Sequence, residues 1–225
     1  MQSTIRADWL ADDELKRAER YAFDLDRSRF VVRRGVLRAL LGAYLGLHPS
    51  HIRLETVGRG KPVLNRAHHP SVHFNVSFSR NQALFAFSQN VELGIDIEAV
   101  RTIPEMEALA DSILSPGEKA FWVQLPPPEK EQAFCRFWTR KEAIVKGLGT
   151  GLGFPLNKIE LSLKEKQEVR ISDIQEDSWE LHEIHAPEGF CAALAVREKV
   201  NEIVYLDWPS DFEIVNRIED LAQAG

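Results

Sequence analysis

Cysteine is scarce in this sequence, which has only Cys135 and Cys191 among its 225 residues. Both stand in apolar stretches, so we expect reduced thiols in a protein core rather than a disulfide bond. Long apolar runs are also missing, since no stretch approaches the roughly 18 residues that a transmembrane helix requires. The first residues lack the apolar segment of a secretory signal peptide. These absences predict a cytoplasmic protein that does not associate with membranes.

An excess of basic residues is missing too. The chain has 28 Lys and Arg residues against 34 Asp and Glu residues, which gives a formal net charge of −6. Because nucleic-acid binding relies on a basic surface, we expect no nucleic-acid partner. The pairs His68-His69 and His182/His185 have no cysteine or third ligand at a zinc-site spacing, which argues against a histidine-based metal site.

The most informative stretch is residues 91–98, V-E-L-G-I-D-I-E. Its strict alternation predicts a β-strand with one apolar face and a second face that carries Gly94, Asp96 and Glu98. A glycine inside a strand often marks the close approach of a ligand or of another backbone. Two carboxylates on one side repel each other unless a cation lies between them, although solvent-exposed strand faces also often carry acids.

The order of the predicted elements indicates an α+β fold. Helices at 12–24 and 27–45 precede strands at 51–57, 71–79, 82–88 and 91–98, of which the last three are expected to form an antiparallel meander. Further helices are predicted at 104–114, from 116 onward, and at 129–146. They precede strands at 158–163, 169–171, 179–185, 190–196 and 202–206, and a short helix at 211–222. The second half repeats the order of the first, which suggests an N-terminal half, residues 1–103, and a C-terminal half, residues 104–225.

The helix at 129–146 places Glu142 and Lys146 four residues apart on one stripe. An exposed pair of this kind contributes only about 0.2–0.5 kcal/mol, and a surface ion pair is the simplest interpretation of this helix by itself. Gly147 is expected to end the helix, as Gly46 ends the helix at 27–45. The arginines of that earlier helix fit either a solvated face or a site for a phosphorylated small molecule.

Three motifs, in order and at compatible spacing, resemble those of the Sfp-type 4'-phosphopantetheinyl transferases. They are Gly60-Lys61-Pro62, residues 94–98 (G-I-D-I-E) and residues 138–146 (W-T-R-K-E-A-I-V-K), and residues 74–79 (F-N-V-S-F-S) match a fourth motif in part. Each motif is modest alone, and the combination is specific. The resemblance implies an α+β fold of two similar α/β halves in a pseudo-twofold arrangement, with the active site between the halves.

Enzymes of this family transfer the 4'-phosphopantetheine arm of coenzyme A to a serine hydroxyl of an apo carrier protein and release adenosine 3',5'-bisphosphate. By resemblance, Asp96, Glu98 and Glu142 hold a magnesium or manganese ion at the diphosphate of coenzyme A. Lys141 and Lys146 are expected where charge develops during phosphoryl transfer. The base that takes the serine proton is either Glu142 or a metal-bound water, and we favour Glu142.

The resemblance places further coenzyme A contacts nearer the N-terminus. The residues expected to make them are Lys61, Pro62, Ser77, Arg29 and Arg34. Phe78 departs from the family, which usually has a histidine there that contacts the 3'-phosphate. Because phenylalanine cannot donate a hydrogen bond, Arg80 or a helix arginine would have to substitute. We therefore expect weaker discrimination between coenzyme A and its 3'-dephospho form.

The implied partner is an apo acyl carrier or peptidyl carrier protein, contacted through residues 101–121 and the region between the halves. We expect a monomer, because the larger members of the family have both halves in one chain. Two other interpretations stay open. A noncatalytic relative would bind a carrier or coenzyme A, and the intact set of carboxylates argues against it. A magnesium-dependent phosphate-ester hydrolase would release free phosphopantetheine without any carrier.

Overall fold

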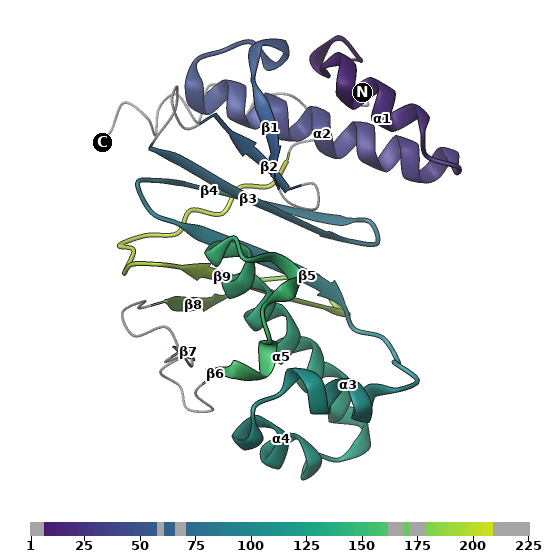
Figure 1. The fold of residues 1–225 in the computed structure, drawn as a ribbon, viewed down its shortest axis with the longest axis vertical. Helices are drawn as coiled ribbons and strands as arrows, with labels where there is room; N and C mark the ends of the chain where they lie inside the picture. The colour runs from purple at the N-terminus through teal and green to yellow at the C-terminus, as the bar shows by residue number, and fades with distance from the viewer. Residues whose placement is uncertain (1–6, 58–60, 66–70, 162–168, 172–178, 209–225) are drawn as a thin grey trace. The chain divides into compact units, whose positions relative to one another are not determined.

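The structure is a computed structural model that describes residues 7–57, 61–65, 71–161, 169–171 and 179–208 (Figure 1). Its contacts divide the chain into two units, Met1–Leu54 with Ile203–Gly225, and Glu55–Glu202. The mixture of helices and strands confirms the predicted α+β class. The boundary expected at residue 103 stays a prediction. None of the described helices is both long and apolar enough to cross a lipid bilayer.

In its described part, the first unit is mainly helical. Its elements are η1 (Ala7–Trp9), α1 (Asp12–Glu19), α2 (Asp24–Leu45) and η2 (Pro49–His51). The helix expected at 12–24 is therefore shorter, and the next helix begins earlier than expected. Helix α2 ends as predicted at Gly46, whose φ of 63° is in the left-handed region that glycine adopts without a steric penalty.

The second unit contains the strands. They pair as β1 (Leu54–Val57, which begins at the boundary of the units) with β2 (Lys61–Leu64), β3 (Val72–Ser79) with β4 (Gln82–Gln89), and β6 (Ile159–Leu161) with β7 (Val169–Ile171). A three-stranded sheet has the order β5 (Leu93–Ala99), β9 (Phe190–Val196) and β8 (Glu180–Glu183).

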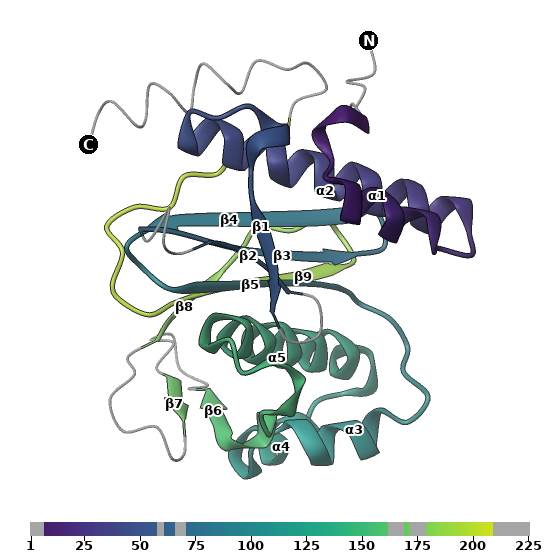
Figure 2. The ribbon, with the colours of Figure 1, turned by 45° about the horizontal axis from the view of Figure 1, so that its top comes forward.

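The expected meander is half right. Strands β3 and β4 form the predicted antiparallel hairpin, with Ser79 opposite Gln82. Strand β5, however, hydrogen-bonds to β9 and not to β4. Figure 2 shows β3 beside β5, and side chains of β3 bond to the backbone of β5 along this edge. The meander prediction failed because β5 takes as its partner β9, a strand that lies far from it in the sequence.

Three α-helices complete the second unit: α3 (Met106–Ile113), α4 (Pro116–Val123) and α5 (Pro127–Leu148), followed by η3 (Gly151–Gly153) and η4 (Leu156–Lys158). Helix α4 begins with the predicted capping box, in which Ser115 and Glu118 bond each other's backbone N–H groups. Helix α5 does not end at Gly147 as expected. It continues to Leu148, and Gly149 with a φ of 72° closes it.

Small residues let α5 approach the sheet closely. A Cβ atom at Gly94 would meet the carbonyl oxygen of Ala143 and the backbone nitrogen of Gly147, and a Cβ atom at Gly147 would lie 2.5 Å from the Trp179 ring. On β9, Ala195 lies opposite Gly94. The glycine inside the predicted strand therefore marks the approach of another backbone, and Gly147 serves packing rather than helix termination.

The end of the described chain differs from expectation. No strand forms at residues 202–206 in the described chain, where Val204 is 52% and Tyr205 is 58% exposed, so these side chains gain no burial from pairing. The helix expected at 211–222 lies outside the described residues. Both cysteines are buried and free, as predicted.

Candidate active site

The candidate site lies where α5 faces β5, and it joins residues from both predicted halves of the chain. Lys146 of α5 places its Nζ atom 2.6 Å from Asp96 Oδ1 and 2.8 Å from Ser77 Oγ. Asp96 is only 3% exposed, whereas the Lys146 side chain is 28% exposed. The close approach through Gly94 thus brings a buried carboxylate and a partly accessible ammonium group together.

Two serines of β3 hold the carboxylates of β5. Ser77 Oγ donates a hydrogen bond to Asp96 Oδ1 at 2.8 Å, and Ser79 Oγ donates one to Glu98 Oε2 at 2.9 Å. Ser77, which was expected to contact coenzyme A, therefore lies in the site, where it contacts Asp96 and Lys146. Ser79 was not among the predicted site residues. The alternation of polar and apolar residues in F-N-V-S-F-S could have identified it, because it predicts one polar face that includes Ser79.

Negative charge is concentrated here. Burial raises the pKa of the Glu142 carboxyl, the charges of Asp96 and Glu98 raise it further, and Lys146 opposes them. Burial likewise raises the pKa of Glu98, where the Ser79 hydrogen bond opposes the shift and the Asp96 charge adds to it. Asp96, Glu98 and Glu142 therefore interact electrostatically, and a cation among them would relieve their repulsion.

The donor set suits a divalent cation. Asp96 Oδ2 is buried and has no hydrogen-bond partner within the described chain. Such an oxygen, beside two further carboxylates, fits a hard cation that prefers oxygen ligands. In their present positions, the acidic, histidine and cysteine side chains of the described residues form no ready group of three ligands, and Lys146 occupies Asp96 Oδ1. The metal site stays a prediction that the residue types fit.

The structure places Lys141 elsewhere. This residue is fully buried, and its Nζ atom lies 2.6 Å from a Glu118 carboxylate oxygen. It also donates to the carbonyl oxygens of Ile113, at 2.8 Å, and Leu156, at 3.1 Å. Burial lowers the pKa of this ammonium, and Glu118 opposes the shift. Three partners use its three donors, so this placement does not support the predicted contact with coenzyme A.

The predicted arginines lie in the first unit. Arg34 Nε is 3.2 Å from Glu14 Oε1, and its guanidinium lies over the Phe30 ring. Glu14 also accepts a hydrogen bond from the buried Arg38 at 2.6 Å. Arg34 therefore joins α1 to α2, which does not favour the predicted adenine or 3'-phosphate contact. Arg29 is 40% exposed and 3.8 Å from Asp26, and its role stays a prediction.

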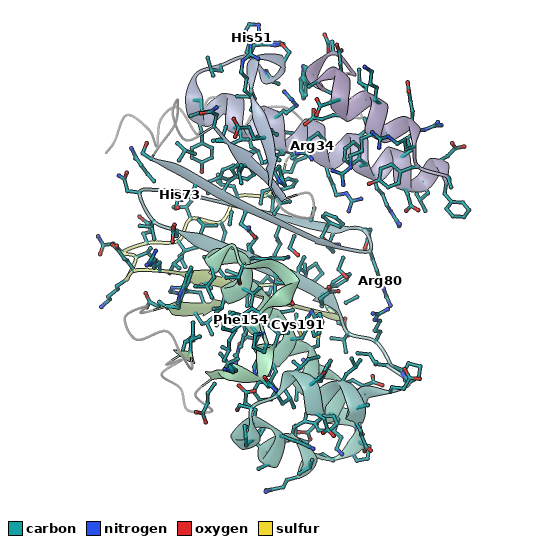
Figure 3. All side chains as sticks on the ribbon, viewed as in Figure 1. Arg34, His51, His73, Arg80, Phe154 and Cys191 are labelled. Carbon is teal, nitrogen blue, oxygen red and sulfur yellow. The ribbon has the colours of Figure 1, made fainter. Side chains whose placement is uncertain are left out.

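The remaining predicted residues are only partly described. Lys61 and Pro62 begin strand β2, whereas Gly60 of the same motif lies outside the described residues. Phe78 is 53% exposed, in alternation with the inward-facing Ser77 and Ser79. Arg80 follows in the turn between β3 and β4, where Figure 3 shows it near the C-terminal end of β5. The roles expected for these residues stay predictions.

Sequence comparison agrees with the motifs. A sequence model of the 4'-phosphopantetheinyl transferase superfamily matches residues 92–195, and a model of the N-terminal part of 4'-phosphopantetheinyl transferases matches residues 2–90. The 4'-phosphopantetheinyl transferase HetI of a Nostoc species is 37% identical over 188 residues, which cover 83% of this chain and 78% of the relative.

More distant proteins are also similar. The mouse L-aminoadipate-semialdehyde dehydrogenase-phosphopantetheinyl transferase is 28% identical over 224 residues, covering 86% of this chain and 71% of the relative. A solved holo-(acyl-carrier-protein) synthase of Bacillus anthracis, in complex with coenzyme A (3',5'-ADP), is 24% identical with a TM-score of 0.41. That likeness covers 47% of this chain and 95% of the solved one.

Proposed function

The chain belongs to the 4'-phosphopantetheinyl transferase superfamily, and we propose that it transfers the 4'-phosphopantetheine arm of coenzyme A to a serine hydroxyl of an apo carrier protein. Adenosine 3',5'-bisphosphate is the second product. The observation that supports this reaction best is the meeting of Lys146 and Asp96, which places a cation and a carboxylate from two distant motifs side by side. Relatives named as transferases of this class support the same reaction.

In the proposed reaction, the serine oxygen of the carrier forms a bond to the phosphorus of the phosphopantetheine arm. The bond from that phosphorus to the bridging diphosphate oxygen breaks, and the bisphosphate leaves. Glu142 accepts the serine proton in this proposal, and a metal-bound water is the alternative base. Lys146 is partly accessible, and we expect its ammonium group to contact the diphosphate of bound coenzyme A.

Asp96, Glu98 and Glu142 would hold the magnesium or manganese ion. A divalent ion bound there would neutralise the diphosphate and stabilise charge on the leaving oxygen. Ser77 and Ser79 keep one oxygen of each β5 carboxylate engaged on the side of β3. Asp96 Oδ2, which has no hydrogen-bond partner within the described chain, is left for the cation.

The proposed partner is an apo acyl or peptidyl carrier protein. Apolar side chains are exposed on α3 and α4, where Leu109 is 38%, Phe121 42% and Val123 49% exposed. This group includes part of the segment 101–121 expected to contact the carrier, and such side chains suit the apolar centre of a protein interface. A monomer, as expected for this family, remains part of the proposal.

Intact-mass measurement of carrier proteins tests the proposal. Apo acyl carrier and apo peptidyl carrier proteins are incubated with the enzyme, coenzyme A and Mg²⁺, and a gain of one phosphopantetheine arm is expected. A chelator or the Glu142→Gln substitution should abolish the gain. Binding of coenzyme A without transfer to either carrier would favour a noncatalytic relative. Release of free phosphopantetheine without a carrier would favour a hydrolase.

A further inference from the structure

Three polar side chains of β3 bond the backbone of β5 at alternate residues. Asn75 Oδ1 accepts a hydrogen bond from Ile95 N at 3.1 Å, and Ser77 Oγ accepts one from Ile97 N at 3.3 Å. Ser79 Oγ accepts one from Ala99 N at 3.1 Å. We call these three side chains the β3 ladder. They satisfy backbone donors along the edge of β5 that does not face β9.

The two serines of the β3 ladder also donate hydrogen bonds. A hydroxyl has a single proton, and each serine oxygen here already accepts a hydrogen bond from β5, which directs the proton elsewhere. Ser77 donates it to Asp96 and Ser79 donates it to Glu98. One hydroxyl thus ties the backbone of β5 and its carboxylate to the same point on β3.

Asn75, the first member of the β3 ladder, differs from the two serines in the residue that it faces on β5. Ser77 serves the pair Asp96 and Ile97, and Ser79 serves the pair Glu98 and Ala99, whereas the corresponding residue before Ile95 is Gly94. A glycine has no side chain to orient. Asn75 therefore shares the backbone function of the serines and has no carboxylate at position 94 to orient.

We propose that Ser79 is a positioning residue that fixes Glu98 through its Oε2 atom and thereby sets the affinity of the site for a divalent cation. This inference rests on the proposed function, because it takes Glu98 as a cation ligand. Residues that orient metal ligands typically change metal affinity by about 10–100-fold when they are removed. The Ser79 hydroxyl is suited to that role, since its own orientation is fixed by the Ala99 N–H.

The test is a Mn²⁺ titration of the full chain, in which the EPR signal of free Mn²⁺ measures binding. Ser79→Ala should weaken Mn²⁺ binding by about 10-fold or more, and Ser79→Thr, which keeps the hydroxyl, should restore it. Asn75→Ala is the matched control, because it removes a backbone partner from the same ladder beside Gly94. It should lower the melting temperature without changing Mn²⁺ affinity by more than about twofold. If Ser79→Ala does not fold, Ser79→Val replaces it, since valine has the shape of threonine without the hydroxyl.

Two results would overturn the inference. One is wild-type Mn²⁺ affinity in the Ser79 variant that lacks a hydroxyl. The other is an equal loss in Asn75→Ala, which would show that loosening of β5 alone is responsible. The intact mass of the carrier protein distinguishes a failure of the Ser79 inference from a failure of the proposed function. Transfer by the wild type together with either result refutes the role of Ser79 alone, whereas absence of transfer by the wild type refutes the proposed function.

Discussion

Lys146 Nζ lies 2.6 Å from Asp96 Oδ1, although 50 residues separate the two in the sequence. The ammonium group therefore neutralises a buried carboxylate at the position where a cation is proposed to bind. The same oxygen also accepts from Ser77. In the proposed site, Lys146 and a divalent ion would share this carboxylate, and their contributions can be separated by experiment.

Replacement of Lys146 should slow catalysis without weakening cation binding. Lys146→Met is expected to lower kcat for arm transfer by about 10²–10³-fold, the usual cost of losing one preorganised electrostatic contact to a transition state. Mn²⁺ affinity should be unchanged or higher, because Asp96 Oδ1 loses a competing partner. Intact mass gives the rate, and EPR gives the affinity. A variant with the wild-type rate would contradict the role of Lys146.

Lys141 should matter for stability rather than for coenzyme A binding. Lys141→Met leaves Glu118 buried without its cation and should cost about 3–5 kcal/mol in the free energy of unfolding, measured with urea. Lys119→Met removes the partner of Asp111 at an exposed pair and should cost no more than about 1 kcal/mol. A stable Lys141→Met enzyme with a raised KM for coenzyme A would instead restore the original expectation for this residue.

The contact between β5 and α5 makes Gly94 sensitive to substitution. Gly94→Ala introduces a Cβ atom against Ala143 and Gly147, and the overpacking should cost about 1–3 kcal/mol or more in the free energy of unfolding. Gly153→Ala is the control, because its Cβ atom would meet nothing within 4 Å. Denaturant unfolding of both variants decides the matter. Equal free energies of unfolding for Gly94→Ala and Gly153→Ala would contradict the close contact between α5 and β5.

Phe78 should determine how well the enzyme recognises the 3'-phosphate of coenzyme A. Phe78→His adds a hydrogen-bond donor at a position that is 53% exposed, so little packing should be lost. The ratio of kcat/KM for coenzyme A to that for 3'-dephospho-coenzyme A is expected to rise. Phe78→Leu, which adds no donor, should leave the ratio unchanged. The same ratio in the wild type and in Phe78→His would refute the hypothesis that Phe78 weakens recognition of the 3'-phosphate.

Local features of the fold could be predicted because they depend on neighbouring residues. The capping box of Ser115 and Glu118, the end of α2 at Gly46 and the alternation in β5 each follow from a few positions. The pairing of β5 with β9 could not be read in the same way, since it joins residues far apart in the sequence. Gly147 was misread because a glycine that ends a helix and one that packs against a strand look alike in sequence.

The candidate site shows the same division. Asp96, Glu142 and Lys146 belong to motifs whose combination is specific, and the structure brings Lys146 to Asp96. Lys141 belongs to one of those motifs too, yet one step along a helix turns a side chain by about 100° and here leads it to Glu118. Arg34 likewise faces Glu14. A sequence motif names the residue types and leaves open which of them face the site.

The pairing of β5 with β9 also has a consequence for biosynthesis. Leu93 lies opposite Val196, and Ala99 lies opposite Phe190, so the strand that holds Asp96 and Glu98 is made long before its partner. On the ribosome, the nascent chain cannot complete this sheet until residue 196 has left the exit tunnel. The enzyme therefore gains its carboxylate site only after β9 has been made, and a chain truncated before β9 would have every predicted site residue but no strand to pair with β5.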